Sequence, residues 1–472
     1  MNSRYPVVFL LGALLLLGSC KKYLDVQPET SYTENQVYNS ESALIQAFNG
    51  LYLDLAARPL YGSFLTNSVI ELMAQRFKPV VDGSQDMSSF VGYNYTALHA
   101  GQMLDTIWRK AYGTILATNV FLSKIDNSIA ANVVSEANGK LLKGEAMAIR
   151  GMLHFDLLRL YGPVYSTGNG SPAIPYYTIA DGKMQPILSA AEVLEKVLAD
   201  LTTAKQLLAA DPVITKGVVF EHDFYSSARN QRLNYFAVKA LLARAYLWAG
   251  RTGDAHAEAQ SAITEGEQWF PWVEADAVNN ASNPDRVFAP EILFGVYNPQ
   301  LYNIYDKFFN PALTDQSIYV PYESRFTELF EGMFQDYRVV QTWLTGGGKS
   351  YRTFYKFAPQ ATKNTWEFVQ PLVRKSELYL ILAETETDPA KALDFLNTER
   401  RRRGLANLPG TATLSLEIRK EYQKEFWGEG QIFFYYKRIN ANDVPMADLP
   451  YPWATVEPVY KVPLPLSETT TR

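Results

Sequence analysis

Cysteine and histidine are scarce in this chain of 472 residues, which has one cysteine, Cys20, and four histidines. A single thiol cannot form an internal disulfide, and it cannot build a cysteine-rich zinc site. Lys and Arg total 44 against 49 Asp and Glu, so the basic excess typical of nucleic-acid-binding proteins is missing. With 47% hydrophobic and 20% charged residues, the composition is that of a folded protein and excludes wholesale disorder.

Long apolar runs are also missing, apart from residues 7–17, which follow Arg4. This run is shorter than the ~20 residues of a membrane-spanning helix, so it predicts a signal peptide over residues 1–19. It leads into Gly18-Ser19-Cys20, which resembles the lipobox of bacterial lipoproteins. The resemblance implies that Cys20 is lipidated and that residues 20–40 form a tether. The alternative is an ordinary secretory signal with an incidental cysteine.

Most of the remaining chain has the periodicity of amphipathic helices. Apolar residues recur at i, i+3 and i+4, without interior proline, in residues 41–55, 108–125, 134–161, 190–210, 233–265, 372–385, 389–403 and 416–436. Asp388 and Pro389 suit the N-cap and first turn of a helix. Residues 270–370 are instead rich in Pro, Asn, Gly and aromatics, and they predict loops with a few short strands and helices.

One helical segment has the spacing of a tetratricopeptide repeat. The matching positions in residues 234–263 are Leu242, Ala243, Tyr246, Ala255 and Ala262, and a turn falls at residues 250–253. Residues 376–397 resemble a degenerate second copy. No regular period runs along the whole chain, so a simple solenoid is not expected.

A series of motifs runs along nearly the whole chain. They lie in residues 20–28, in the W..Y..I...N pattern of Trp108, Tyr112, Ile115 and Asn119, and in residues 145–164, 237–249, 396–404, 418–438 and 461–465. In this order they resemble the SusD/RagB family of outer-membrane nutrient-binding lipoproteins from Bacteroidetes. Two positions depart from the family pattern: Tyr165 stands where proline is usual, and Gln431 where arginine is usual.

The resemblance implies a mainly α fold, in which tetratricopeptide-like helical pairs form one large domain with an irregular, loop-rich inserted subdomain. We place the helical regions at residues 41–265 and 372–472 and the irregular subdomain at residues 266–371. It also implies a SusC-like TonB-dependent transporter as partner, and a ligand that is usually an oligosaccharide.

Charged clusters favour structural roles over catalysis. The basic run at residues 399–403 ends at Gly404, as expected for the last turn of a helix. Glu421, Glu425 and Glu429 recur every four residues, which stacks carboxylates on one helix face, often beside Arg419 or Lys424. Gly348-Lys349-Ser350 resembles the end of a P-loop, but Trp343 stands where that loop needs glycine. We therefore expect no catalytic residue, metal site, cofactor or nucleic-acid partner.

Two aromatic clusters outside the predicted helices suit a sugar. Rings stack on the apolar C–H faces of sugars, while polar side chains bind the hydroxyls. The first cluster, residues 90–95, includes Tyr93, Asn94 and Tyr95, with Gln75 and Arg76 nearby. The second includes Tyr302 and Tyr305 and continues to Tyr319 and Tyr322. We expect Tyr93, Asn94, Tyr95, Tyr302 and Tyr305 to bind the ligand, with Tyr93 and Tyr95 exposed on either side of Asn94. Core packing is the alternative for any single tyrosine.

These observations favour a lipid-anchored outer-membrane protein, facing the cell exterior, that captures a nutrient and delivers it to a transporter. Two alternatives stay open at this point. The first is a tetratricopeptide-like protein-interaction scaffold without a small ligand. The second is a surface glycoside hydrolase, for which paired carboxylates do the chemistry.

Overall fold

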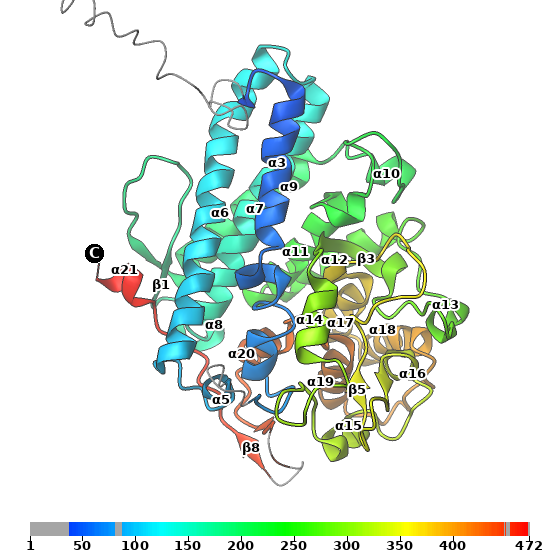
Figure 1. Cartoon of the computed structure of the whole chain (residues 1–472). Coiled ribbons are helices and arrows are strands. Elements are labelled where there is room, and N and C mark those ends of the chain that lie inside the picture. The colour runs from blue at the N-terminus through cyan, green and yellow to red at the C-terminus, as the bar shows by residue number, and fades with distance from the viewer. Residues whose placement is uncertain (1–36, 81–86, 448, 450–453, 471–472) are drawn as a thin grey trace, which may run out of the picture.

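The computed structural model of the chain describes residues 37–80, 87–447, 449 and 454–470 (Figure 1). The predicted signal peptide and Cys20 lie outside these residues. The long helices are α3 (Glu41–Leu55), α6 (Leu98–Ala130), α7 (Glu136–Tyr161), α9 (Ala190–Leu207), α11 (Tyr235–Trp248), α12 (Thr252–Gly266), α17 (Lys375–Thr385), α18 (Pro389–Arg402) and α19 (Leu414–Glu425). The mainly α fold class is confirmed.

Shorter elements complete the chain. The short helices are η2 (Arg58–Gly62), α4 (Val69–Met73), α5 (Ser88–Val91), α8 (Tyr165–Gly168), α10 (Val213–Lys216), η3 (Arg229–Gln231), α13 (Ala275–Asn279), η4 (Ala289–Glu291), α14 (Leu301–Phe308), α15 (Glu323–Leu329), α16 (Tyr337–Val340), α20 (Ile432–Arg438) and α21 (Leu466–Thr469). The strands are β1 (Pro172–Pro175), β2 (Ile187–Ser189), β3 (Ile292–Tyr297), β4 (Trp343–Leu344), β5 (Thr353–Phe354), β6 (Val369–Arg374), β7 (Val444–Pro445) and β8 (Thr455–Val456).

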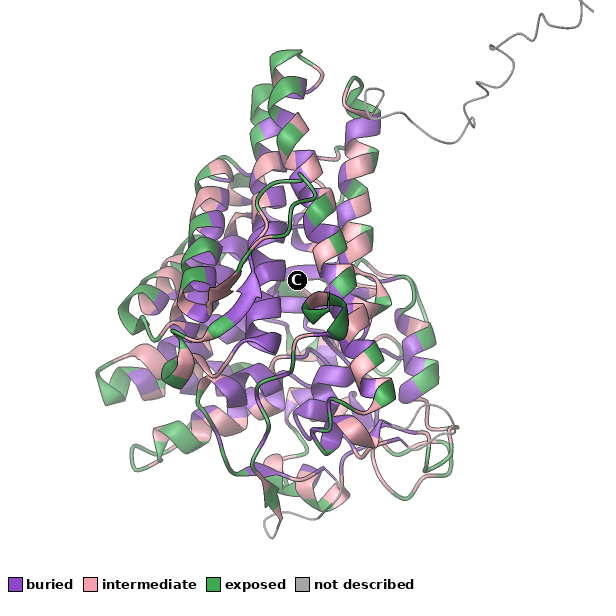
Figure 2. Ribbon diagram, turned by 90° about the vertical axis from the view of Figure 1, so that its left-hand side faces the viewer, coloured by how far each residue is buried: buried purple, intermediate pink, exposed green. Residues whose placement is uncertain are grey.

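Consecutive long helices pack against each other in pairs: α3 with α6, α7 with α9, α11 with α12, and α17 with α18. In the α11–α12 pair, Ala243 and Ala255 are wholly buried, and Tyr246 is partly buried against the same core. Gly250, with φ +73°, makes the turn between these two helices. The tetratricopeptide-like pairing predicted from the sequence is therefore present, and buried residues follow the contacts between helices (Figure 2).

Helix starts agree with the capping signals in the sequence. The Ser40 side chain accepts a hydrogen bond from the Ala43 N–H at 3.2 Å, and α3 has the predicted bounds. Asp388 accepts from the Ala390 N–H at 2.9 Å, with Pro389 as the first residue of α18. At the other end of α18, Gly404 has φ +73°, a conformation that favours glycine.

Two of the predicted helices are wrong in part. Residues 372–374 belong to β6 rather than to α17, because they pair antiparallel with β3. Residues 416–436 are not one helix: α19 stops at Glu425 and α20 starts at Ile432. Between them Gly428 and Gly430 have positive φ, and a Cβ at Gly430 would clash with the Leu65 carbonyl. A close backbone approach therefore breaks the helical period here.

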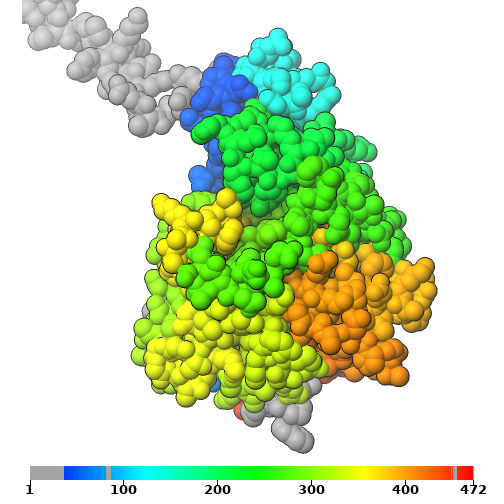
Figure 3. Space-filling view, turned by 90° about the vertical axis from the view of Figure 1, so that its right-hand side faces the viewer, coloured from blue at the N-terminus to red at the C-terminus, as the bar shows by residue number. Residues whose placement is uncertain are grey.

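The irregular region is tied to the helical body through its strands. The sheets formed by the described residues are two-stranded, and β3 of the irregular region pairs with β6, which leads directly into α17. Figure 3 shows that the green and yellow segments of this region form much of one face of the molecule, next to the orange residues of α18.

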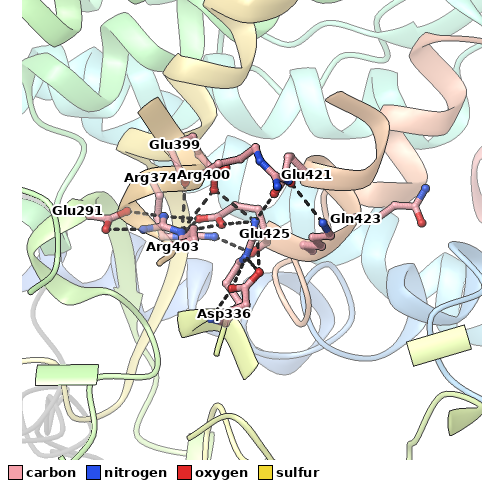
Figure 4. A network of polar contacts seen from close by, with 12 residues as sticks. Glu291, Asp336, Arg374, Glu399, Arg400, Arg403, Glu421, Gln423 and Glu425 are labelled. Carbon is pink, nitrogen blue, oxygen red and sulfur yellow. Dashed lines mark hydrogen bonds and ion pairs between the residues drawn. The ribbon is translucent and has the colours of Figure 1, made fainter. Parts of the chain in front are cut away.

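A network of buried ion pairs joins α18, α19 and β6 (Figure 4). Its cations are Arg338, Arg374, Arg400 and Arg403, and its carboxylates are Glu291, Asp336, Glu399, Glu421 and Glu425. Burial opposes the charged form of Glu425, yet Arg403 and Arg374 hold the pKa of this carboxylate well below its usual range.

This network shows which of the charged side chains predicted to pair on the helix of residues 416–436 do so. Glu421 contacts Lys424 at 3.2 Å, as the helical spacing predicts. Arg419 does not join the stacked carboxylates, because it pairs with Asp443 at 2.9 Å. The carboxylates of Glu421 and Glu425 are buried among arginines, so they do not form an open catalytic pair.

Candidate functional site

The segment after Arg76, which lies near the first aromatic cluster in the sequence, meets the second aromatic cluster in the folded chain. The Lys78 N–H donates to the Val320 carbonyl at 2.9 Å. The Phe77 ring stacks on Tyr319, with centroids 5.6 Å apart and an interplanar angle of 19°. The Lys78 Nζ lies 3.9 Å from the centroid of the Tyr322 ring. Segments more than 200 residues apart in the sequence thus build one surface.

On one side of this junction lies a polar and aromatic surface, which we call the open face. It consists of Lys78, Asp315, Tyr322, Lys349 and Tyr351, of which Asp315 is exposed and the others are half-buried. The Asp315 Oδ1 accepts hydrogen bonds from the Lys349 Nζ at 2.5 Å and from the Tyr351 Oη at 2.7 Å. These two hydrogen bonds lower the pKa of Asp315, so the carboxylate is charged at neutral pH.

The glycines before Lys349 position it on the open face. Gly347 has φ +57°, and a Cβ there would clash with the Pro311 carbonyl. The tight turn therefore needs glycine for a conformational reason, not to hold a phosphate. This geometry agrees with the conclusion from the sequence that residues 348–350 do not belong to a P-loop.

On the other side of the junction lies a pocket of about 320 Å³ between α15 and α19, which we call the α15–α19 pocket. Its volume is at the lower end of the range of small-molecule sites. Its apolar walls come from Pro321, Phe326, Leu329, Leu416, Trp427 and Pro445. Its polar lining comes from Arg76, Arg325, Glu328, Arg419, Lys420, Gln423, Asp443 and Thr455.

Arg76 and Trp427 form the inner part of this pocket. Both side chains are buried, and the Arg76 guanidinium lies 3.4 Å from the Trp427 ring centroid. Arg76 donates to the Gln423 carbonyl. Its nearest carboxylate oxygen is Glu71 Oε2, 3.9 Å from the Arg76 Nε. Among the described residues, neither the Arg76 Nε nor the Trp427 Nε1 has a hydrogen-bond acceptor.

Burial changes the ionisation of this pair. Burial lowers the pKa of Arg76 to about 10, although Glu71 favours its charged form. Burial likewise raises the pKa of Glu71 to about 7, although Arg76 and the Gly430 N–H favour the carboxylate. Glu71 is therefore a weak counter-ion for Arg76 near neutral pH.

The first group of predicted ligand residues is mostly buried. The Tyr93 Oη donates to the Met73 carbonyl at 3.1 Å, and the Tyr95 Oη donates to the Val459 carbonyl at 2.8 Å. The expectation that these two tyrosines are exposed is wrong, because their rings pack in the main core. Asn94 is exposed and accepts from the Thr96 Oγ1 at 3.1 Å.

The second group is divided in the same way. Tyr305 is buried, and its ring centroid lies 6.0 Å from that of Tyr355. Tyr302 is half-buried against Phe368, and its Oη donates to Glu367 at 3.2 Å. Among the described residues, the hydrogen bonds and ring contacts of Tyr302 and Tyr305 are with Glu367, Phe368 and Tyr355, not with Tyr93 or Tyr95. Whether any of the five residues contacts a ligand stays a prediction.

Sequence reasoning found part of the junction and missed the rest. Arg76 and Tyr322 were named beside the two aromatic clusters, and both lie at the junction. Lys78, Asp315 and Tyr351 were missed, because no local pattern marks residues that only the fold brings together. Trp427 lies between Glu425 and Glu429 in the sequence, and no sequence pattern predicts that it lines the pocket.

The described residues lack two features. They hold no group of three His, Cys, Asp or Glu side chains arranged for a metal ion. No helix in the described ranges has the length and apolar character of a membrane span.

Comparisons with known proteins identify the family. Residues 22–247 match a family described as "Starch-binding associating with outer membrane", and residues 254–462 match the one described as "SusD family". SusD-like protein P38 of Formosa agariphila is 25% identical over 206 residues, which are 42% of this chain and 36% of that protein. A SusD-like protein of Bacteroides ovatus is 24% identical over 248 residues, or 51% of this chain and 38% of that protein. The matched segments thus span little more than a third of these curated relatives.

Solved structures show the same fold. A SusD superfamily protein from Bacteroides thetaiotaomicron has a TM-score of 0.71 at 22% identity, covering 91% of this chain and 98% of that one. A laminarin-binding SusD-like protein has a TM-score of 0.61 at 19% identity, covering 85% and 92%. The two family matches, which together cover nearly the whole sequence, show that the chain belongs to the SusD family.

Proposed function

We propose that this protein captures an oligosaccharide at the outer membrane and delivers it to a SusC-like TonB-dependent transporter. The observation that carries the proposal is the junction at Lys78 and Val320, where two irregular segments build the open face beside a pocket. The relatives are described as starch-binding, sugar-binding and laminarin-binding proteins, which supports a glycan as the ligand class.

The chemistry of the open face suits this ligand. Tyr322 and Tyr351 offer partly exposed rings for the C–H faces of a sugar. Asp315 accepts hydrogen bonds from hydroxyl groups, and Lys78 and Lys349 donate to them. Asn94 and Tyr302 are the members of the predicted set with exposed surface, and we propose them as additional contacts.

Capture needs no chemistry on the ligand, and we propose none. The carboxylates that suggested a hydrolase, Glu421 and Glu425, are buried in ion pairs with arginines. A retaining or inverting glycosidase needs two carboxyl groups that flank a bound substrate. This arrangement favours a binding protein over the enzyme.

A glycan array probed with the full-length chain in detergent tests capture. We expect binding to one glycan class, with laminarin as the first defined probe because a structural relative binds it. Reducing-sugar release from the bound glycan should stay at background. An array without any bound glycan, together with stable binding of a protein partner, would support the scaffold alternative instead.

We further propose that a lipid on Cys20 tethers the protein to the outer membrane, because two acyl chains on one anchor give stable attachment. Cys20→Ala should abolish labelling by a palmitate analogue and release the protein from the membrane fraction. A labelled, membrane-bound Cys20→Ala variant would contradict the tether. It would leave glycan capture untouched, since Cys20 lies outside the residues that build the site.

A further inference from the structure

A second hollow lies between α6, the loop at residues 176–186 that joins β1 to β2, and α21; we call it the α6–α21 groove. Its volume of about 460 Å³ is within the range of small-molecule sites. In Figure 1, β1 and α21 lie on the opposite side of the view from α15 and β5, so the groove is separate from the open face. It shares no lining residue with the α15–α19 pocket.

Two half-buried tyrosines line the groove, Tyr112 on α6 and Tyr177 in the loop. Their ring centroids lie 5.4 Å apart, with an interplanar angle of 74°. The Tyr112 Oη donates to the Pro175 carbonyl at 2.8 Å, and the Tyr112 ring centroid lies 4.7 Å from that of the buried Trp108. These contacts fix the Tyr112 ring and leave part of it exposed.

Two buried side chains of the helical body hold the backbone of Tyr177. Its N–H donates to the His154 Nε2 at 3.1 Å, and its carbonyl accepts from the Asn119 Nδ2 at 3.1 Å. The Gln185 N–H donates to the Tyr177 Oη at 3.4 Å. Tyr177 is therefore positioned before any ligand arrives, which lowers the cost of ordering the site on binding.

Aliphatic side chains add to the apolar surface of the groove. Leu116 on α6 and Ile179 and Met184 in the loop are 50%, 58% and 52% exposed. Large apolar side chains that stay in water at one place mark a binding surface. Beside tyrosine rings, they suit the C–H faces of a sugar.

Charged side chains also line the groove. The Arg109 Nε pairs with Asp105 at 2.9 Å, and the Lys183 Nζ lies 3.9 Å from Asp181. Each cation has a carboxylate beside it, and Glu468 also lines the groove, so the charges favour a neutral ligand over an anion. The Arg109 and Lys183 side chains are 68% and 80% exposed, and such groups donate to hydroxyls in place of water.

We propose that the α6–α21 groove is a second glycan-binding site, in which a neutral sugar ring packs on Tyr112 and Tyr177. Its hydroxyls contact Arg109 and Lys183. The ligand class rests on the proposed function, and the new site lies away from the open face. A docked protein segment would use the same aliphatic side chains, but two preorganised tyrosine rings beside hydroxyl-binding groups favour the sugar.

Met184 provides a reporter in the groove. With isotope-labelled methionine methyl groups, its NMR signal is assigned by comparison with Met184→Leu. Titration with laminarihexaose, or with an oligosaccharide of the class that the array selects, should shift this signal until the site is saturated. The shift should persist in Tyr322→Ala/Tyr351→Ala, because the open face lies elsewhere.

Variants connect the shift to the groove. Tyr177→Ala should weaken the affinity measured at Met184 at least about threefold, while Tyr177→Phe keeps the ring and should bind like the parent. Ile179→Ser changes an exposed side chain, so it should fold like the parent and weaken the affinity by a similar factor. Phe220→Ser, at an exposed apolar residue outside the groove, is the matched control.

Three outcomes would overturn the inference, and they differ in what they leave standing. An unshifted Met184 signal, together with glycan binding in calorimetry, would leave capture at the open face intact. A Met184 signal that responds to a protein partner but not to the glycan would assign the groove to protein docking. If no glycan bound and the array stayed empty, the proposed function would fail as well.

Discussion

Arg403 and Glu425 form an ion pair in the interior of the protein, with the Arg403 Nη2 2.6 Å from the Glu425 Oε1 and both side chains fully shielded from solvent. Arg403 also contacts Glu291 at 2.7 Å, so it links the irregular region to α19. The pair belongs to the network that holds α19 in place. It thereby connects the stability of the core with the geometry of the α15–α19 pocket.

Arg403→Met should lower the free energy of unfolding by about 3–5 kcal/mol, because it leaves buried carboxylates without their counter-ion. Arg401→Met is the matched control in the same basic run. The Arg401 side chain is 46% exposed, and its loss should change stability by only about 0–1 kcal/mol. Denaturant unfolding measures both variants, and equal stabilities would show that the buried network contributes nothing beyond a surface pair.

His154 should make the protein sensitive to acid. Burial lowers the pKa of His154 to about 3, and its Nε2 accepts a hydrogen bond from the Tyr177 N–H at 3.1 Å. The folded pKa lies below the ordinary value of 6.5, so this contribution to stability is complete above pH 6.5. It is lost at about 1.4 kcal/mol per pH unit as the pH falls from 6.5 toward 3.

Comparison of the parent with His154→Gln isolates this term. Glu71, with its raised pKa, changes stability in the opposite sense between pH 4.5 and 7, but it does so in both proteins. The unfolding free energy of His154→Gln should therefore fall less steeply with acid, while His222→Gln, at an exposed site, should follow the parent. Parallel curves for all three proteins would mean that folding does not lower the pKa of His154.

The α11–α12 pair should not tolerate a larger side chain. Ala243→Trp or Ala255→Trp overpacks a wholly buried contact and should cost about 1–3 kcal/mol or more. Ala257→Trp, on the exposed side of α12, is the control and should melt close to the parent. An unchanged melting temperature for the two buried variants would contradict close packing of these helices.

The predicted ligand tyrosines should now separate into two classes. Tyr302→Ala, at a half-buried ring, should weaken glycan binding by about 0.5–1.5 kcal/mol if stacking is the main loss. Tyr93→Ala removes a buried ring and should lower stability by about 3–5 kcal/mol. Tyr93→Phe keeps the ring and serves as its control. Full affinity in Tyr302→Ala would place the ligand away from Tyr302.

The sequence predicted those parts of the fold that depend on local signals. The apolar spacing of residues 41–55 predicted α3 to the residue, and Asp388 with Pro389 predicted the start of α18. It did not predict that residues 372–374 form a strand, because their pairing partner lies about 80 residues earlier. It also missed the break after Glu425, which depends on how closely Gly430 approaches Leu65.

The site was less predictable than the fold. Tyrosine is amphipathic, so the sequence of residues 90–95 is compatible both with a sugar-binding surface and with a core segment. In the structure Tyr93 and Tyr95 are buried in the core. Tyr351 donates a hydrogen bond to Asp315 across 36 residues, and the charge of Lys78, more than 200 residues away in the sequence, favours the Asp315 carboxylate. Such proximity follows from tertiary packing, which residue spacing does not encode.

The most direct test of glycan capture at the open face is calorimetry with the glycan that the array identifies. The double variant Tyr322→Ala/Tyr351→Ala should lose about 1–3 kcal/mol of binding free energy, the sum of two stacking contacts. Tyr165→Ala, at a half-buried tyrosine on α8, should bind like the parent. Full affinity in a folded double variant would contradict the account, because it would place the ligand somewhere other than the open face.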